Sequence, residues 1–251
     1  MKIALIGDIH ANLPALEAVL DHIAENNITK IWNTGDFVGY GPFPNEVVHL
    51  FRTAQRLRPK DVLSIIGNYD LKVLEFKHKK KKWRKKKHPL KYRAFQWTCE
   101  TLAKKNRKFL HFLTQEIRVK IKGHRVLLTH GSPASNTEHL SPSTPEKRLR
   151  KLARTAKANL IVCGHSHQPF ARQVDGVWFI NPGSVGRPDD GDPRASFAIL
   201  EIKPEQVHVE HHRLEYDVEQ TVAAIHEHEL PESFAQMFLR GRNLDVVLGG
   251  E

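Results

Sequence analysis

The stretch MKIALIGDIH, residues 1–10, decides the fold of this chain. A short apolar run closed by glycine is typical of a buried parallel strand. In α/β sheets, the polar residues that follow such strands gather at one edge. We therefore expect Asp8 and His10 at the mouth of a site. If the chain leaves the strand in an extended conformation, both side chains point the same way and Ile9 turns back into the core.

Four later apolar runs predict strands that end in the same way, with residues able to bind a metal directly after them. These runs lie near residues 31–32, 62–66, 126–129 and 160–163. The third run is the second strand of an expected hairpin that begins at residue 117. The residues that follow the four runs are Asp36; then Asn68, Tyr69 and Asp70; then His130; and finally His165 and His167.

Apolar residues recur at helical spacing between these strands, which is the alternation typical of an α/β fold. Asn12 is a suitable N-cap for the first helix, and Pro14 fits its first turn. Further helices are expected at residues 45–54, 90–107 and 146–157 and from residue 218 onward, with hairpins at residues 170–180 and 195–211.

Length and composition indicate one domain over residues 1–251, with a loosely held tail from about residue 240. No run approaches the roughly 18 apolar residues of a membrane span, and Asp8 interrupts the N-terminal run too early for a signal peptide. Only two cysteines, Cys99 and Cys163, are present, so no disulfide framework is expected. These observations predict a cytoplasmic protein without a membrane partner; they leave the oligomeric state open.

The net charge of +11 comes mainly from one place. Residues Lys77–His88, the basic segment, hold eight lysines and one arginine without an acid. The simplest interpretation, without a function, is a solvated, disordered insertion. The alternative is that this segment lies near the cleft and recruits a polyanion such as nucleic acid, with Trp83 stacking on a base.

Carboxylate, amide and imidazole groups together suit divalent Mn, Fe, Ni or Zn. One ion does not need seven ligands, but two ions do if a carboxylate bridges them, and such a pair is suited to in-line displacement at phosphorus. The strand-end residues that supply these groups are Asp8, His10, Asp36, Asn68, His130, His165 and His167.

The order of these motifs resembles that of the calcineurin-like metallophosphoesterases. The matching stretches are Asp8-x-His10, Gly35-Asp36, Gly67-Asn68-x-Asp70, His130-Gly131 and Gly164-His165-Ser166-His167, which span about two thirds of the chain. The Asn181-Pro182-Gly183-Ser184 stretch and the residues 191–195 are similar to the small prokaryotic phosphodiesterase branch.

The resemblance implies a metal pair. One ion would be held by Asp8, His10, Asp36 and His167, and the other by Asp36, Asn68, His130 and His165. Asp36 would be the bridge, and a hydroxide shared by the ions would attack phosphorus in line. We expect two divalent ions, Mn in the first place and Fe, Ni or Zn as alternatives.

We also expect catalytic roles for His10, Asn68, Tyr69 and Asp70; Asp70 either orients a ligand or is a simple turn residue. Tyr69 departs from the family, which usually has histidine there, and a phenol is a poorer proton donor. Gly39 departs too, where many members have aspartate. Arg187 and Arg194 either meet substrate phosphate or form structural salt bridges, and His139 is expected at the surface.

We therefore expect a four-layer α-β-β-α sandwich, with two mixed sheets, helices outside and a dinuclear metal site at the strand ends. The predicted function is metal-dependent hydrolysis of a phosphodiester substrate. Two alternatives stay open. One is a phosphomonoesterase or phosphoprotein phosphatase, and the other is a nucleic-acid-binding module built on the same scaffold.

Overall fold

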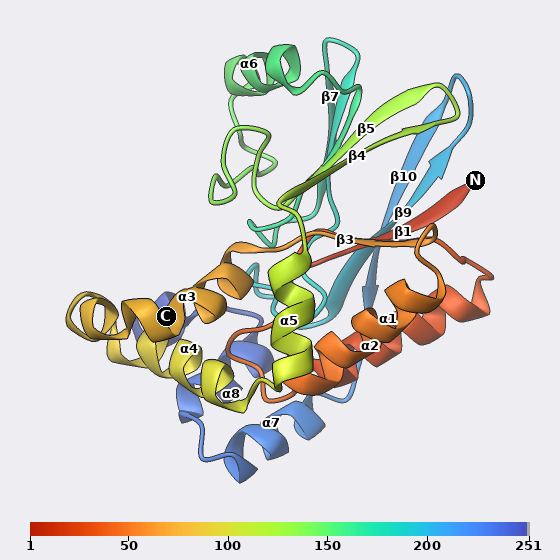
Figure 1. Cartoon of the computed structure of the whole chain (residues 1–251). Helices are drawn as coiled ribbons and strands as arrows, with labels where there is room; N and C mark the ends of the chain where they lie inside the picture. Colours follow the sequence, from red (N-terminus) through yellow and green to blue (C-terminus); the bar gives the residue numbers. More distant parts are fainter. Residues whose placement is uncertain (250–251) are drawn as a thin grey trace.

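Two mixed five-stranded sheets form the centre of the computed structural model, which describes residues 1–249 (Figure 1). The first sheet has the order β10-β9-β1-β2-β3, and the second has the order β4-β5-β6-β8-β7. In the first sheet β1, β2 and β3 are parallel, and in the second β5, β6 and β8 are parallel. The strands are β1 (Lys2–Ile6), β2 (Ile31–Asn33), β3 (Val62–Ser64), β4 (Glu116–Ile121), β5 (His124–Thr129), β6 (Leu160–Val162), β7 (Phe170–Val174), β8 (Val177–Asn181), β9 (Ala195–Ile202) and β10 (Val207–Leu214).

Alternate residues of β1 face different layers, because successive side chains of a strand point to opposite faces. Ile3 and Leu5 pack between the two sheets, in one apolar cluster with Val126 and Leu128 of β5. Ala4 instead packs toward α1 (Leu13–Glu25) and α2 (Pro44–Leu57), on the outer face of the first sheet.

The second sheet is covered in the same manner. Ile161 and Phe179 pack outward against α6 (Glu146–Ala156). The layers are therefore helix, sheet, sheet and helix, which confirms the expected sandwich (Figure 1). Asn12 caps α1 as expected, since its side chain accepts a hydrogen bond from the backbone N–H of Ala15 at 3.3 Å.

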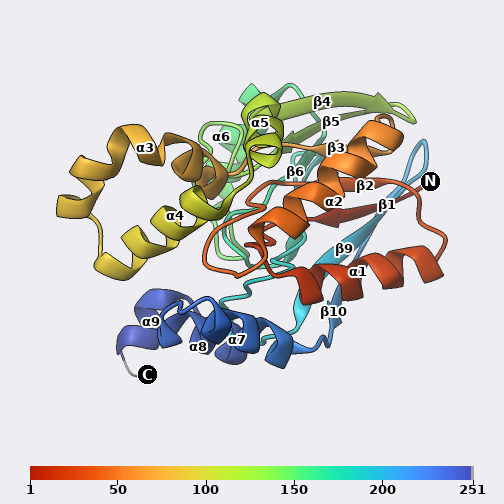
Figure 2. The same cartoon turned by 60° about the horizontal axis from the view of Figure 1, so that its bottom comes forward.

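The basic segment is helical, so the expectation of a disordered insertion is wrong. It forms the second half of α3 (Asn68–Lys86), which lies beside α4 (Pro89–Thr101) in an arm that projects from the sheets (Figure 2). Apolar side chains of α3 fix this arrangement, because Trp83 is 9% exposed and its ring centroid lies 5.7 Å from that of Phe95. Trp83 is therefore a packing residue and is not available to stack on a base.

The expected helix over residues 90–107 is two helices, α4 and α5 (Lys104–Phe112). The chain turns between them at Leu102 and Ala103, both of which have extended ψ angles. Sequence periodicity missed this break because neither residue is a glycine or a proline.

The C-terminal residues are folded as far as residue 249. They form α7 (Val218–Glu227), α8 (Glu232–Arg240) and α9 (Leu244–Gly249), which lie along the same side of the molecule (Figure 2). Leu244 is buried, and Asp245 forms a 2.7 Å ion pair with Lys91 of α4. The loose tail expected from residue 240 is thus wrong up to residue 249, and residues 250–251 lie outside the described residues. Within residues 1–249, no helix has both the length and the apolar character that a membrane crossing requires.

Candidate metal centre

All seven predicted ligand positions lie at the carboxyl ends of parallel strands. Asp8 and His10 follow β1, Asp36 follows β2, and Asn68 begins α3 after β3. The second sheet contributes His130 after β5 and both His165 and His167 after β6. Because the two sheets face each other, residues from position 8 to position 167 converge at a single edge of the sandwich.

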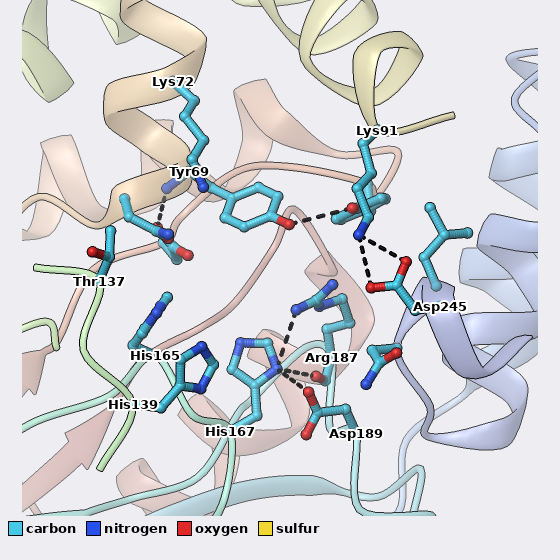
Figure 3. Close-up of a pocket in the computed structure, with 15 residues that line it drawn as sticks. Tyr69, Lys72, Lys91, Thr137, His139, His165, His167, Arg187, Asp189 and Asp245 are labelled. Atoms are coloured by element: carbon cyan, nitrogen blue, oxygen red, sulfur yellow. Dashed lines mark hydrogen bonds and ion pairs between the residues drawn. The ribbon is translucent and has the colours of Figure 1, made fainter. Parts of the chain in front are cut away.

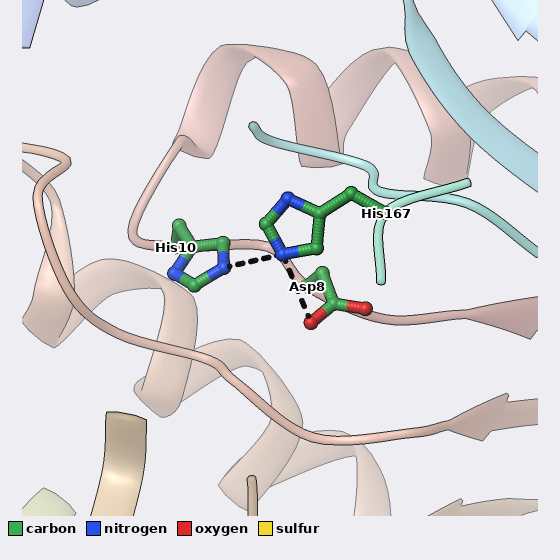
Figure 4. A group of neighbouring side chains, drawn as sticks. All are labelled: Asp8, His10 and His167. Atoms are coloured by element: carbon green, nitrogen blue, oxygen red, sulfur yellow. Dashed lines mark hydrogen bonds and ion pairs between the residues drawn. The ribbon is translucent and has the colours of Figure 1, made fainter. Parts of the chain in front are cut away.

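The first group of side chains consists of Asp8, His10 and His167, all buried (Figure 4). Their ligand atoms all lie within 4.8 Å of one another. The Nε2 atoms of His10 and His167 are 3.1 Å apart, and Asp8 Oδ1 is 3.4 Å from His167 Nε2. Asp8 Oδ1 and His10 Nδ1 are buried without any hydrogen-bond partner. Since buried polar atoms are normally satisfied, this donor set fits a divalent cation.

The second group consists of Asp36, His130 and His165, with ligand atoms likewise within 4.8 Å of one another. His130 Nε2 lies 3.4 Å from Asp36 Oδ2 and 3.3 Å from Asn68 Oδ1. The ring of His165 is 5.1 Å from that of His130, measured between centroids. Asn68 thus belongs to this group by position.

Asp36 connects the two groups. Its Oδ2 atom lies 3.4 Å from His130 Nε2 and 3.8 Å from His10 Nε2, so one carboxylate oxygen faces both. Its other oxygen accepts a 2.7 Å hydrogen bond from the backbone N–H of Tyr69. Burial disfavours a charged carboxyl, yet the surrounding histidines hold the pKa of Asp36 well below its usual range. Burial alone would lower the pKa of His130, but the charge and hydrogen bond of Asp36, the charge of Asp8 and the Thr34 carbonyl together raise it to about 9.

Backbone carbonyls orient two of the histidines. The Nδ1 atom of His130 lies 2.8 Å from the carbonyl of Thr34, and that of His167 lies 2.7 Å from the carbonyl of Arg187. A carbonyl can only accept, so in each ring Nδ1 carries a hydrogen, and Nε2 is the atom that faces the centre and can bind a cation once the ring is neutral.

Left-handed backbone is concentrated at this centre. The extended geometry that we expected after β1 is wrong, because Asp8 has φ +51° and His10 has φ +50°. Asp36, His165 and His167 also have φ between +55° and +67°. Non-glycine residues rarely adopt this conformation, and when they do they often lie at functional sites. Ile9 is fully buried, as expected.

Asp70 holds together two backbone segments next to the metal centre. It is fully buried, and its two oxygens accept hydrogen bonds from the backbone N–H groups of Gly67, at 3.0 Å, and Val38, at 3.2 Å. These contacts join the loop that contains Asp36 to the start of α3. Burial and the charge of Asp36 raise the pKa of Asp70 to about 7.

A cavity of about 390 Å³ opens next to the metal centre (Figure 3). Its walls include Tyr69 and Lys72 of α3, Lys91 of α4, Arg187 and, from the C-terminal segment, Asp245. Tyr69 Oη is 3.2 Å from Tyr40 Oη, and the Tyr69 ring stands edge-on to that of His10 with centroids 5.2 Å apart. The residue that departs from the usual histidine therefore lies directly beside a predicted ligand.

Sequence reasoning missed several residues of this cavity. Lys72 was detectable, because it lies one helical turn beyond Asn68 on the same face of α3. Lys91 and Asp245 gave no local signal, since distant helices bring them to the cavity. Arg187 lies in the cavity, whereas Arg194 forms a 2.7 Å ion pair with Asp192 outside it. His139 is exposed as expected, yet it lines the cavity, and its ring centroid lies 4.2 Å from that of His165, with the two rings tilted by 50°.

Comparisons with known protein sequences identify the family of this chain. The model of the calcineurin-like phosphoesterase superfamily domain matches residues 1–205. A Methanocaldococcus jannaschii protein, MJ0912, is 34% identical over 96% of this chain and 98% of its own length. The phosphodiesterase YfcE of Escherichia coli is 27% identical, over 80% of this chain and 88% of the relative.

Comparison with solved structures identifies the same family. The crystal structure of a metallophosphoesterase from Sphaerobacter thermophilus superimposes with a TM-score of 0.77 at 31% identity. The match covers 96% of this chain and all of that one.

Proposed function

Because the chain belongs to the calcineurin-like phosphoesterase superfamily and is a phosphoester hydrolase, we propose that it is a phosphodiesterase with two divalent metal ions. The single observation that carries this proposal is the position of Asp36. One of its oxygens faces His130 and His10 at 3.4 Å and 3.8 Å, as a carboxylate shared by two ions would. An isolated ion would leave one of these two groups of donors unused.

We propose that one ion is held by the first group together with Asp36, and the other by the second group together with Asn68. When bound, the pair supplies Lewis-acid stabilisation of the phosphoryl oxygens and makes water acidic enough to act near neutral pH. The metal-binding residues are Asp8, His10, Asp36 and His167 for the first ion, and Asp36, Asn68, His130 and His165 for the second.

Tyr69 acts on the substrate in this proposal. Its hydroxyl reaches the cavity beside His10 and is held by Tyr40, whose own pKa burial raises above the usual range. Tyr69 therefore donates a hydrogen bond to a phosphoryl or leaving oxygen, but it protonates a poor leaving group less readily than histidine would. This chemistry favours diesters and activated esters.

Mn is the ion we propose first, with Fe, Ni and Zn as alternatives, because three oxygen-donor residues accompany the four imidazoles. We also propose a reducing compartment such as the cytoplasm, since Cys99 and Cys163 are both buried free thiols.

The test is a panel of metals and esters. Purified protein is stripped with chelator, reloaded with Mn, Fe, Ni or Zn, and assayed on bis-p-nitrophenyl phosphate and p-nitrophenyl phosphate. Two ions per chain and a higher kcat/KM for the diester support the proposal. One ion per chain contradicts the metal pair, and a higher kcat/KM for the monoester favours the phosphomonoesterase alternative.

The basic segment favours a nucleic-acid substrate. Within residues 77–88 only Lys79 forms an ion pair, with Glu75 at 2.6 Å, and every lysine except the half-buried Lys87 is exposed. The segment belongs to α3, whose first turns line the cavity, so the helix that carries this charge begins at the metal centre (Figure 2). We propose that it recruits single-stranded nucleic acid electrostatically.

Replacing Lys79, Lys80, Lys81 and Lys82 with glutamine keeps a helix former at each position while removing the charge. The affinity for an oligonucleotide should fall, and its double-logarithmic dependence on salt should become shallower by about 0.7 for each phosphate that is no longer neutralised. A control removes four lysines from α5 and α6, at residues 104, 105, 147 and 151. Equal slopes for the wild type and the α3 variant would contradict recruitment.

A further inference from the structure

Arg187 is a buried cation that forms no ion pair among the described residues, although the carboxylate of Asp189 lines the same cavity. Its side chain is 7% exposed and lies against the cavity wall, and its Nε atom has no hydrogen-bond partner. Its Nη2 atom is 3.4 Å from His167 Nδ1, but that nitrogen already gives its hydrogen to the Arg187 carbonyl and cannot accept a second one. Among residues 1–249, no carboxylate forms an ion pair with Arg187, although buried charges are normally paired.

Lys72 lies on the other side of Tyr69 in the same cavity (Figure 3). Its Nζ atom is 4.5 Å from the Tyr69 ring centroid, and the Arg187 guanidinium carbon is 5.7 Å from that centroid. Lys72 also forms no ion pair with any described carboxylate, and burial lowers its pKa. Lys91 differs, because Asp245 neutralises it at 2.7 Å. Two cations beside the metal centre are therefore left to bind an anion.

We infer that Lys72 and Arg187 form a second phosphate subsite, distinct from the metal ligands. This inference rests on the proposed phosphodiesterase function. It specifies the substrate class as a phosphodiester that carries a further phosphate a few bonds from the scissile phosphorus. The scissile group lies at the metal centre, and the second phosphate lies beside Tyr69, where Lys72 and Arg187 approach the ring from its two sides. The cavity, at about 390 Å³, falls in the range of sites that take a small-molecule ligand.

A matched pair of ligands tests the subsite directly. Thymidine 3′,5′-bisphosphate and thymidine 5′-monophosphate differ only in the 3′-phosphate. Their Kd values are measured by calorimetry on the Mn-loaded protein. Charge-assisted hydrogen bonds predict that the bisphosphate binds about tenfold to hundredfold more tightly. Lys72→Met and Arg187→Met should each reduce this ratio by about tenfold, whereas the exposed Lys151→Met on α6 should leave it unchanged.

Hydrolysis gives an independent readout. The p-nitrophenyl ester of thymidine 5′-phosphate is compared with the same ester bearing a 3′-phosphate, and the ratio of their kcat/KM values should follow the ratio of the Kd values. Arg187→Lys keeps the charge and should retain part of the ratio, which separates the subsite from a folding defect.

The outcomes separate the subsite from the proposed function. Equal Kd values for the two nucleotides, or variants that weaken both equally, overturn the subsite. The subsite is also overturned if inorganic phosphate binds in a way that depends on Arg187 while the two nucleotides bind equally well. The site would then bind a free anion. If neither ester is hydrolysed while the Kd ratio holds, the subsite stands and the phosphodiesterase proposal fails.

Discussion

Replacing Gly164 with alanine tests how closely the backbone must approach the metal centre. A Cβ atom on Gly164 would lie 2.7 Å from Asp8 Oδ2 and 2.5 Å from Thr34 Oγ1. Gly164 cannot retreat easily, because its N–H donates to the His130 carbonyl at 2.7 Å and its own carbonyl accepts from Asn181 at 2.8 Å. Atoms in ordinary contact stand about 3.5 Å apart, so the Asp8 carboxylate must move by about 0.5 to 1 Å.

Misplacement on this scale costs about 100-fold in rate. We expect Gly164→Ala to lower kcat/KM on bis-p-nitrophenyl phosphate by about that factor and to weaken Mn binding in a calorimetric titration. Overpacking adds a destabilisation of about 1 to 3 kcal/mol, which lowers Tm by a few degrees in a chain of this size.

Gly176→Ala is the matched control. Gly176 lies in the turn between β7 and β8 with φ +77°, and its Cβ would meet no atom within 4 Å. Alanine there should lower Tm by a few degrees through backbone strain alone, with kcat/KM and Mn affinity unchanged. The reasoning is refuted if Gly164→Ala keeps wild-type Mn affinity and a kcat/KM within threefold of the wild type.

Three further outcomes follow from the same geometry. Asp36→Asn should leave fewer than two ions per chain by elemental analysis and lower kcat/KM by about 1,000-fold or more, since a neutral amide cannot serve two cations; two retained ions would contradict the bridge. Tyr69→His should raise turnover of alkyl phosphomonoesters, and unchanged turnover would exclude Tyr69 as the group that limits leaving-group protonation. In chelator, His10→Gly should be at least as stable to urea as His10→Ala, because the left-handed φ of +50° favours glycine; the usual order, with glycine lower by about 1 kcal/mol, would show that the conformation stores no strain.

The convergence of the seven predicted ligand positions could be predicted because its signal is local. Each ligand follows an apolar run, and the parallel arrangement of those runs brings their ends together, so Asp8 and His130 meet without any contact having to be predicted. The resemblance to a known family then added the division into two groups. The four layers were predictable only with the help of the family resemblance, because Ile3 and Ala4 are both apolar and do not show from sequence that they face different layers.

The sequence could not indicate what depends on distant packing. The basic segment looks disordered from its charge, yet Trp83 and Phe76 anchor it as a helix against α4. Lys91 and Asp245, 154 residues apart, meet only because the C-terminal helices return to the cavity. The left-handed backbone at Asp8 and His10 was also missed, because aspartate and histidine are enriched in this conformation but still adopt it rarely, and the surrounding structure imposes it.

The position of the predicted ligands would tie the proposed metal binding to the packing of the two sheets. The first sheet supplies Asp8, His10 and Asp36 and the second supplies His130 and His167, so neither sheet holds a complete set for either group. The apolar cluster between the sheets, which includes Leu5 and Leu128, therefore fixes the distance across which the ligands meet. Asp8 Oδ1 and His10 Nδ1 are buried without hydrogen-bond partners, and both residues have left-handed backbone. Each feature destabilises the fold, and the packing between the sheets offsets this cost, so strained and unsatisfied groups can occur together at this edge.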